Sequence, residues 1–229
     1  MKIIHLQTVD STNDYLKRNI NSFDNLTFVD AMFQTKGRGR NGHTWITANN
    51  TSLLLSVLVK EELNPIQLSI GMAYSIIQTL NYYHIKALIK WPNDIFVNDK
   101  KISGILVETI YNSSFQGTII GIGLNVYNDN YISIEEATNI KYSIKEVENK
   151  LIEYFTLNYK LIKDNKYHDI LDKINDLSYL KDKEIDYKNY GIVKFIKLNY
   201  DGTITLENNN QERFNVVINE ISLSNNKKP

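Results

Sequence analysis

The segment that most constrains the fold is "SLLLSVLV" at residues 52–59. It is apolar apart from its serines and has the length of a strand, so it predicts a buried strand. The next segment, residues 64–84, begins with Asn64 as a helix cap and Pro65 at the first helical position. Its apolar residues at helical spacing are Ile66, Ile70, Ala73, Ile77 and Leu80. A buried strand followed by a helix with an apolar face predicts a sheet covered by helices.

Short extended segments continue this pattern at residues 87–91, 95–98, 102–111 and 117–126. Turn residues separate them, which predicts an antiparallel or mixed meander. A second long helix is expected over residues 143–163. The residues that share one broad face of that helix are Val147, Leu151, Tyr154, Phe155 and Ile162.

The pattern changes after residue 180, where apolar and polar residues alternate and Asp201-Gly202 is typical of a hairpin turn. These short strands predict a small β-barrel. A barrel of this size has little core of its own, so we expect it to lean on the larger part of the chain. The sequence therefore predicts a larger part with strands and helices at residues 1–180 and a small β domain at residues 181–229.

Composition excludes several classes of function. The chain has 26 basic and 26 acidic residues, whereas nucleic-acid-binding proteins usually carry a basic excess. There is no cysteine, which excludes thiol nucleophiles and zinc–thiolate sites, and the four histidines lack metal-ligand spacing. The N-terminus does not have the layout of a signal peptide, and no apolar run is long enough to span a membrane. We expect a cytoplasmic protein that binds neither nucleic acid nor membrane.

The run "GRGRNGHTW" at residues 37–45 is the first of four segments whose residues could bind a ligand or take part in a reaction. Its glycines allow positive φ and close backbone approach. Arg38 and Arg40 supply planar donors suited to carboxylate and phosphate, and Trp45 offers a flat face. Taken alone, the run also fits a flexible exposed loop, or an RNA-binding segment, although such segments are usually longer and repeated.

Three further segments have an ordinary reading as well as a chemical one. In "KWPNDIFVNDKKISG" (90–104), Asp94 follows a Pro-Asn turn and Lys101 precedes Gly104; a hairpin with solvated lysines would look the same. "GIGLNV" (121–126) lacks the helix and third glycine of a dinucleotide fingerprint, so its glycines indicate a bulge or a close approach. "DSTND" (10–14) fits a helix cap, where free N–H groups can also bind a ligand.

Together the segments resemble the biotin–protein ligase family. The family pattern has STN, GRGRxGRxW, KWPND, K-[IL]-[AS]-G-[IV]-L-[VT]-E and G-[IA]-G-[IL]-N. The matching residues are Ser11–Asn13, Gly37–Trp45, Lys90–Asp94, Lys101–Glu108 and Gly121–Asn125, in that order. The match spans residues 1–126 by motif and extends by layout to "EISL" (220–223). The resemblance implies an α+β fold: a catalytic domain at residues 1–180, with a mixed sheet backed by helices, followed by an SH3-like barrel at residues 181–229.

The resemblance also implies a reaction and a site. Such ligases use Mg²⁺ and ATP to convert biotin to biotinoyl-5′-AMP, and then transfer biotin to a lysine of a biotin carboxyl carrier domain. The implied biotin contacts are Ser11, Thr12, Asn13, Gln34, Arg38, Gly39, Arg40, Lys101 and Gly104. The implied ATP contacts are Arg38, Arg40, Trp45, Lys101, Gly121, Gly123 and Asn125. Lys101, Arg40 and Asp94 are the implied catalytic residues, Asp94 orienting the incoming amine or accepting its proton, and the loop 37–45 is expected to be a lid. Mg²⁺ is expected to be held through the ATP phosphates.

The chain departs from the family pattern at several positions. Asn41 and His43 replace frequent basic residues of the lid, and Ser224 stands where some relatives have arginine after "EISL". The motifs begin at Ser11, so we expect no DNA-binding domain and no repressor role. The alternatives are a lipoate– or octanoate–protein ligase, a non-catalytic biotin- or adenylate-binding module, and an RNA-binding protein. Pairing through a sheet edge would also allow a homodimer.

Overall fold

A computed structural model describes residues 1–45, 50–127, 131–181, 183–187 and 190–217 of the chain. Its main sheet has seven strands in the order β1-β2-β3-β7-β6-β5-β4. The strands are β1 (Lys2–Val9), β2 (Thr27–Gln34), β3 (Ser52–Val59), β4 (Leu88–Lys90), β5 (Asp94–Val97), β6 (Lys100–Asn112) and β7 (Ser114–Asn125). Strands β1 and β2 pair in parallel and the other neighbours pair antiparallel, so the predicted mixed sheet is confirmed.

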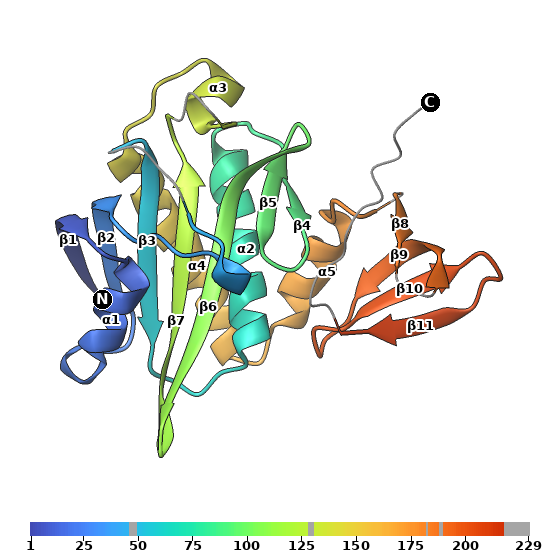
Figure 1. Cartoon of the computed structure of the whole chain (residues 1–229), viewed down its shortest axis with the longest axis horizontal. Coiled ribbons are helices and arrows are strands. Elements are labelled where there is room, and N and C mark those ends of the chain that lie inside the picture. The colour runs from blue at the N-terminus through green and yellow to red at the C-terminus, as the bar shows by residue number, and fades with distance from the viewer. Residues whose placement is uncertain (46–49, 128–130, 182, 188–189, 218–229) are drawn as a thin grey trace.

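Helices cover both faces of this sheet, but unequally (Figure 1). The long helices α2 (Pro65–Tyr82) and α4 (Ile144–Lys163) pack on one face, followed by α5 (His168–Asp176). The short helix α1 (Thr12–Arg18) lies on the opposite face, and the single-turn α3 (Ile134–Thr138) follows β7. The 3-10 turns are Ile20–Ser22 and Arg40–Gly42. Within the described residues, no helix is both long and apolar enough to cross a membrane.

The predicted helix starts are confirmed. Asn64 accepts a hydrogen bond from the Ile66 amide at 2.9 Å, and Ser143 caps α4 in a capping box with Glu146. One predicted core residue of α2 is wrong: Ile66 is 39% exposed. It lies in the first turn of the helix, where its side chain contacts Gly202 of a later hairpin instead of the sheet.

The alternation of side chains along β3 divides the core. Leu53, Leu55, Val57 and Val59 belong to the large cluster under α2 and α4. Leu58, on the other face, belongs to a small cluster with Leu16 and Ile20 from the α1 region. This strand is buried along its full length, as its apolar sequence predicts. The α1 face is only partly filled by apolar side chains, which leaves space there for a ligand.

The C-terminal part of the chain forms a second, antiparallel sheet in the order β11-β10-β9-β8. Its strands are β8 (Glu184–Asp186), β9 (Ile192–Leu198), β10 (Ile204–Asn208) and β11 (Arg213–Val216). Gly202, with φ +84°, is in the predicted hairpin turn. This sheet is consistent with the expected SH3-like module, and "EISL" and Ser224 lie outside the described residues.

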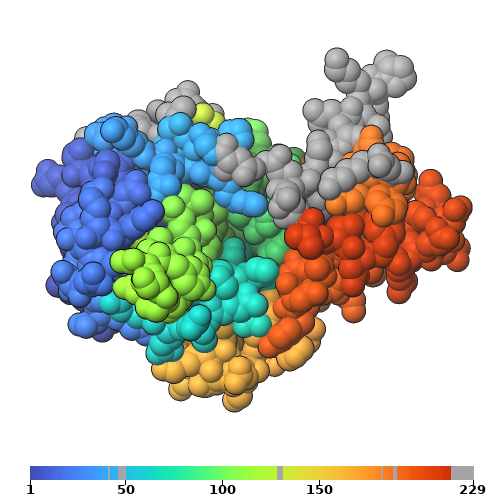
Figure 2. All heavy atoms as spheres, turned by 60° about the horizontal axis from the view of Figure 1, so that its bottom comes forward, coloured from blue at the N-terminus to red at the C-terminus, as the bar shows by residue number. Residues whose placement is uncertain are grey.

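The second sheet forms a lobe beside the main body (Figure 2). The Asn175 side chain of α5 donates to the Leu198 carbonyl at 3.1 Å and accepts from the Leu198 amide at 2.7 Å. Tyr200 packs against the rings of Tyr167 and His168. These contacts agree with the expectation that the small module leans on the larger part. The domain boundary between residues 180 and 181 stays a prediction.

Candidate functional site

A cavity of about 450 Å³ opens on the face of the main sheet that carries α1. Strands β3, β7 and β6 form its floor, and the segment after β2 crosses in front of it (Figure 1). All predicted site residues except Asn125 line it: Ser11, Thr12, Asn13, Gln34, Arg38, Gly39, Arg40, Trp45, Asp94, Lys101, Gly104, Gly121 and Gly123. Five segments that are far apart in the sequence therefore meet at one place.

The turn at Ser11–Asn13 is fixed by hydrogen bonds to β2 and β3. Ser11 caps α1 by accepting from the Asp14 amide, and all three turn residues are buried. The Thr12 amide and hydroxyl both donate to Gln34 Oε1, at 2.7 and 3.0 Å. The parallel pairing of β1 with β2 places the turn beside Gln34, because Val9 and Gln34 are register partners. The turn and Gln34 thus form one rigid polar wall.

Ser56 supports this wall from below and was not among the predicted site residues. Its Oγ lies 2.7 Å from Thr12 Oγ1 and 2.6 Å from Asn13 Oδ1, and the residue is fully buried. The signal for it was present in the sequence, since Ser56 interrupts an otherwise apolar strand. A buried hydroxyl costs free energy unless it is hydrogen-bonded, so a polar neighbour was required.

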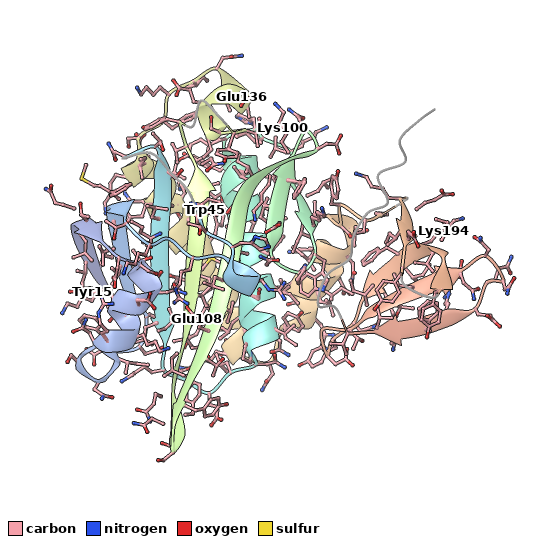
Figure 3. The ribbon with its side chains drawn as sticks, in the orientation of Figure 1. Tyr15, Trp45, Lys100, Glu108, Glu136 and Lys194 are labelled. Carbon is pink, nitrogen blue, oxygen red and sulfur yellow. The ribbon has the colours of Figure 1, made fainter. Side chains whose placement is uncertain are left out.

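Two glycines of β7 make room for side chains that lie flat on the sheet. A Cβ at Gly121 would overlap the Asn13 amide, and one at Gly123 would overlap the Trp45 indole. At Gly104 on the neighbouring β6, a Cβ would lie 3.2 Å from Trp45 Cζ3. The predicted close approach at "GIGLNV" is therefore confirmed. Figure 3 shows Trp45 over the central strands, on the same side as Glu108.

The lid, defined as residues 37–45, is a short hairpin-like loop. The Trp45 amide donates to the Gly37 carbonyl at 3.0 Å, and the Gly39 amide donates to the His43 carbonyl at 2.7 Å. Of its three glycines, Gly42 alone has positive φ, +76°. At Gly37 the structure shows the close backbone approach that the sequence also predicted, because a Cβ there would lie 2.5 Å from the Trp45 carbonyl oxygen. The side chain of Asn41 lies outside the described structure.

Arg38 lies among carboxylates. Its guanidinium donates to both oxygens of Glu108, at 3.1 and 2.9 Å, and to Asp14 at 2.7 Å. Partial burial opposes its charge, but the hydrogen bonds and charges of Glu108 and Asp14 outweigh it and raise the pKa of Arg38 above its ordinary value. Glu108 also accepts from Asn13 Nδ2 at 2.7 Å. It closes the family motif at 101–108, but sequence reasoning gave it no role.

Arg40 and Lys101 have different environments from Arg38. Arg40 donates to the neutral amide oxygen of Asn93 at 3.1 Å. Lys101 Nζ lies 2.7 Å from Asp94 Oδ1 as an ion pair, and 5.6 Å from the centre of the Trp45 ring. Asn93 was missed by the sequence analysis, although it stands in the quoted turn before Asp94.

Asn125 is placed differently from the other predicted residues. Its side chain is buried at the end of β7, accepts from Ser52 Oγ at 3.2 Å and donates to the Ile132 carbonyl at 3.1 Å. It does not line the cavity. In this structure its amide joins β3 and the segment before α3, so an adenine contact by Asn125 stays a prediction.

Comparison with known proteins identifies a family that this chain matches. Residues 5–125 match the Biotin/lipoate A/B protein ligase family, and this is more than half of the chain. The bifunctional ligase/repressor BirA of Escherichia coli is 33% identical over 146 residues, which cover 58% of this chain and 46% of BirA. The human biotin–protein ligase is 32% identical over 112 residues, covering 44% of this chain and 15% of that protein.

Solved structures extend the likeness over the whole chain. The biotin protein ligase of Aquifex aeolicus in complex with biotin and ATP superposes with a TM-score of 0.84 at 28% identity, covering 96% of this chain and 97% of that one. The chain belongs to the biotin/lipoate A/B protein ligase family. The matched region spans less than half the length of BirA.

Proposed function

We propose that the protein is a biotin–protein ligase, which forms biotinoyl-5′-AMP from biotin and Mg-ATP and passes biotin to a carrier lysine. One observation supports this proposal most strongly. The buried, hydrogen-bonded turn at Ser11–Asn13 lines the same cavity as the cations Arg40 and Lys101. The turn suits a neutral polar ring, and the cations suit a carboxylate and phosphates. The structural likeness to a ligase that binds biotin and ATP supports it.

In the first step, a carboxylate oxygen of biotin attacks the α-phosphorus of ATP, and the bond from that phosphorus to the pyrophosphate oxygen breaks. The step joins two anions, so fixed cations must reduce their repulsion and stabilise the charge that grows on the phosphoryl oxygens. Arg40 and Lys101 line the cavity and are assigned this task. Mg²⁺ bound to the ATP phosphates would neutralise part of their charge.

In the second step, a lysine amine of the carrier attacks the acyl carbon, and AMP leaves. The amine must lose a proton, and Asp94 is the only carboxylate among the described residues that line the cavity. While Lys101 is paired with Asp94, that carboxylate is neutralised. Transfer of Lys101 to the adenylate phosphate would free Asp94 to orient the amine or accept its proton. The acceptor is proposed to be a biotin carboxyl carrier domain.

The nearest alternative is a lipoate– or octanoate–protein ligase, because the matched family includes both activities. The biotin-bound structure at 28% identity favours biotin. Biotin-dependent ATP–pyrophosphate exchange, with lipoate and octanoate in parallel, tests the choice. Exchange with biotin alone would support the proposal, and exchange with lipoate alone would assign the sister activity. Absence of exchange with every acid would favour a binding module without catalysis.

Cytoplasmic location and a homodimer through a sheet edge stay predictions. Strands β1 and β4 are the two edges of the main sheet. Sedimentation velocity with and without biotin and ATP would decide the oligomeric state, and a single monomer species in both conditions would contradict the dimer.

A further inference from the structure

We propose that Glu108 is a positioning residue that joins the lid to the turn at Ser11–Asn13, and that Arg38 anchors the lid instead of binding the substrate anions. The inference rests on the proposed function and deepens it. The basis is one contact network: Glu108 Oε2 accepts from Asn13 Nδ2 at 2.7 Å and from Arg38 at 2.9 Å. A single carboxylate oxygen therefore holds one residue from each wall of the cavity.

Charge explains why Arg38 is an anchor. Its guanidinium donates to two carboxylates, those of Glu108 and Asp14. A bidentate arginine–carboxylate pair fixes direction as well as distance. A substrate phosphate would have to displace an anion that is already in place, and the local charge of the three groups is net negative. Among the described residues no carboxylate pairs with Arg40, which donates to the neutral Asn93 amide.

The position of Glu108 explains why it can align both walls. It lies on β6, where it is the register partner of Ile119 on β7, the central strand of the seven-stranded sheet. Its side chain is 22% exposed, so water can reach the pair only in part. Arg38 is the second residue of the lid, and its bridge to Thr44 closes the loop. Fixing Arg38 from β6 therefore fixes the base of the lid, where Arg38 and Thr44 pair.

The Glu108 carboxylate also fixes the orientation of the Asn13 side-chain amide. With Nδ2 held by Glu108, Oδ1 faces Ser56, and the amide lies across Gly121. Loss of the Glu108 charge should therefore disturb two things at once: the order of the lid and the orientation of a turn residue that is proposed to contact biotin. Neither change removes a group assigned to the α-phosphorus, because Arg40 and Lys101 both stay in the cavity lining.

The test compares Glu108→Gln with Glu207→Gln. Glutamine keeps the size of the side chain and one acceptor oxygen but turns an amide N–H₂ toward the donors of Arg38. Glu207 is the matched control, because it also pairs with an arginine, Arg213, at 2.8 Å on a strand, but in the second sheet. In Glu108→Gln, we expect the KM for biotin to rise about tenfold and biotinoyl-AMP to escape faster, with kcat for adenylation changed less than about threefold. Glu207→Gln should behave as wild type.

Exchanging the charges of Arg38 and Glu108 tests whether their ion pair can be restored. The double variant Glu108→Arg with Arg38→Glu restores an arginine–carboxylate pair between β6 and the lid but not the acceptor for Asn13 Nδ2, so part of the biotin KM lost in Glu108→Arg should return. If Glu108→Gln keeps the wild-type KM and retention of adenylate, or lowers kcat alone, the positioning role is wrong.

A measurement on the ligand-free protein separates this inference from the proposed function. Trypsin cleaves after Arg38 and Arg40, and an anchored lid resists it. Faster cleavage at these bonds in Glu108→Gln than in Glu207→Gln supports the anchor even if the wild-type protein shows no exchange with biotin. Equal cleavage rates would overturn the anchor even if the wild-type protein is an active ligase.

Discussion

Lys101 Nζ lies 2.7 Å from Asp94 Oδ1, and an irregularity in the sheet produces this contact. Along β5 and β6, Asp94 pairs with Gly104 and Ile95 with Ser103, but Phe96 pairs with Lys101. The extra residue, Ile102, is fully buried in the core. Because side chains alternate along a strand, a regular β6 would point Lys101 away from the face that carries Gly104. The bulge returns Lys101 to the cavity beside Asp94.

The first prediction concerns this lysine. Lys101→Ala should lower the rate of biotin-dependent ATP–pyrophosphate exchange about 10- to 150-fold, because one charge-assisted contact in the transition state is worth about 1.5–3 kcal/mol. Stability should change by less than about 1 kcal/mol, because the ion pair is partly exposed. Lys100→Ala is the matched control: Lys100 pairs with Glu136 at 3.4 Å, outside the cavity. Exchange at the wild-type rate in Lys101→Ala would contradict the assigned role.

The second prediction tests the packing of Trp45 on the sheet. Gly123→Ala should destabilise the protein or displace the indole, at a cost of about 1–3 kcal/mol, because the new methyl group overlaps the ring. In a Trp45→Ala background the overlap is gone, so the same substitution should cost clearly less. Thermal unfolding of the four proteins gives the coupling energy. Equal costs in both backgrounds would show that the ring does not rest on Gly123.

The third prediction concerns the buried hydroxyl of Ser56. Ser56→Ala should lower the free energy of unfolding by about 1–3 kcal/mol, because Thr12 Oγ1 and Asn13 Oδ1 lose a buried polar neighbour. Biotin affinity should fall as well, since both residues belong to the turn that lines the cavity. Urea denaturation and calorimetric titration with biotin measure the two effects. An unchanged denaturation midpoint would mean that water replaces the hydroxyl.

The fourth prediction is a dependence of stability on pH that arises on the other face of the sheet. Burial raises the pKa of the Glu148 carboxyl, with Lys145 acting in the opposite direction and Asp30 in the same direction. The folded state therefore keeps this proton to a higher pH than the unfolded state, whose value is about 4.5. Stability contributed by the protonated form is lost as pH rises from the unfolded pKa through the folded one.

Replacing Glu148 by glutamine removes this titration. The stability of Glu148→Gln relative to wild type should become more favourable between pH 4 and pH 7, as measured by urea denaturation at several pH values. Glu153→Gln is the control on the same helix, because it removes an exposed pair with Lys150 and no buried charge. If the stability of Glu148→Gln relative to wild type instead decreases with rising pH, the ion pair with Lys145 outweighs the cost of burying the carboxylate.

Much of the fold follows from local sequence patterns. The apolar run at 52–59, the cap Asn64 and the Asp201-Gly202 turn act through residues next to one another in the chain, so their effects can be read from the sequence. The family motifs also predicted most of the cavity lining. The prediction that Ile66 is buried was wrong, because helical spacing identifies the apolar face of a helix but not how far along that face the sheet extends.

The sequence by itself therefore determined the buried strand 52–59, the two long helices and the set of segments that line the cavity, but not strand β2 or helix α5. Only the tertiary structure decided which polar side chains pair. Arg38 pairs with Glu108 and Lys101 with Asp94, and Asn125 is hydrogen-bonded to Ser52 and does not line the cavity. Those pairings depend on strand register and on one bulge, which link residues far apart in the chain. A periodic pattern fixes the side of a strand on which a residue lies, but its partner is set by strand pairing, which local sequence does not contain.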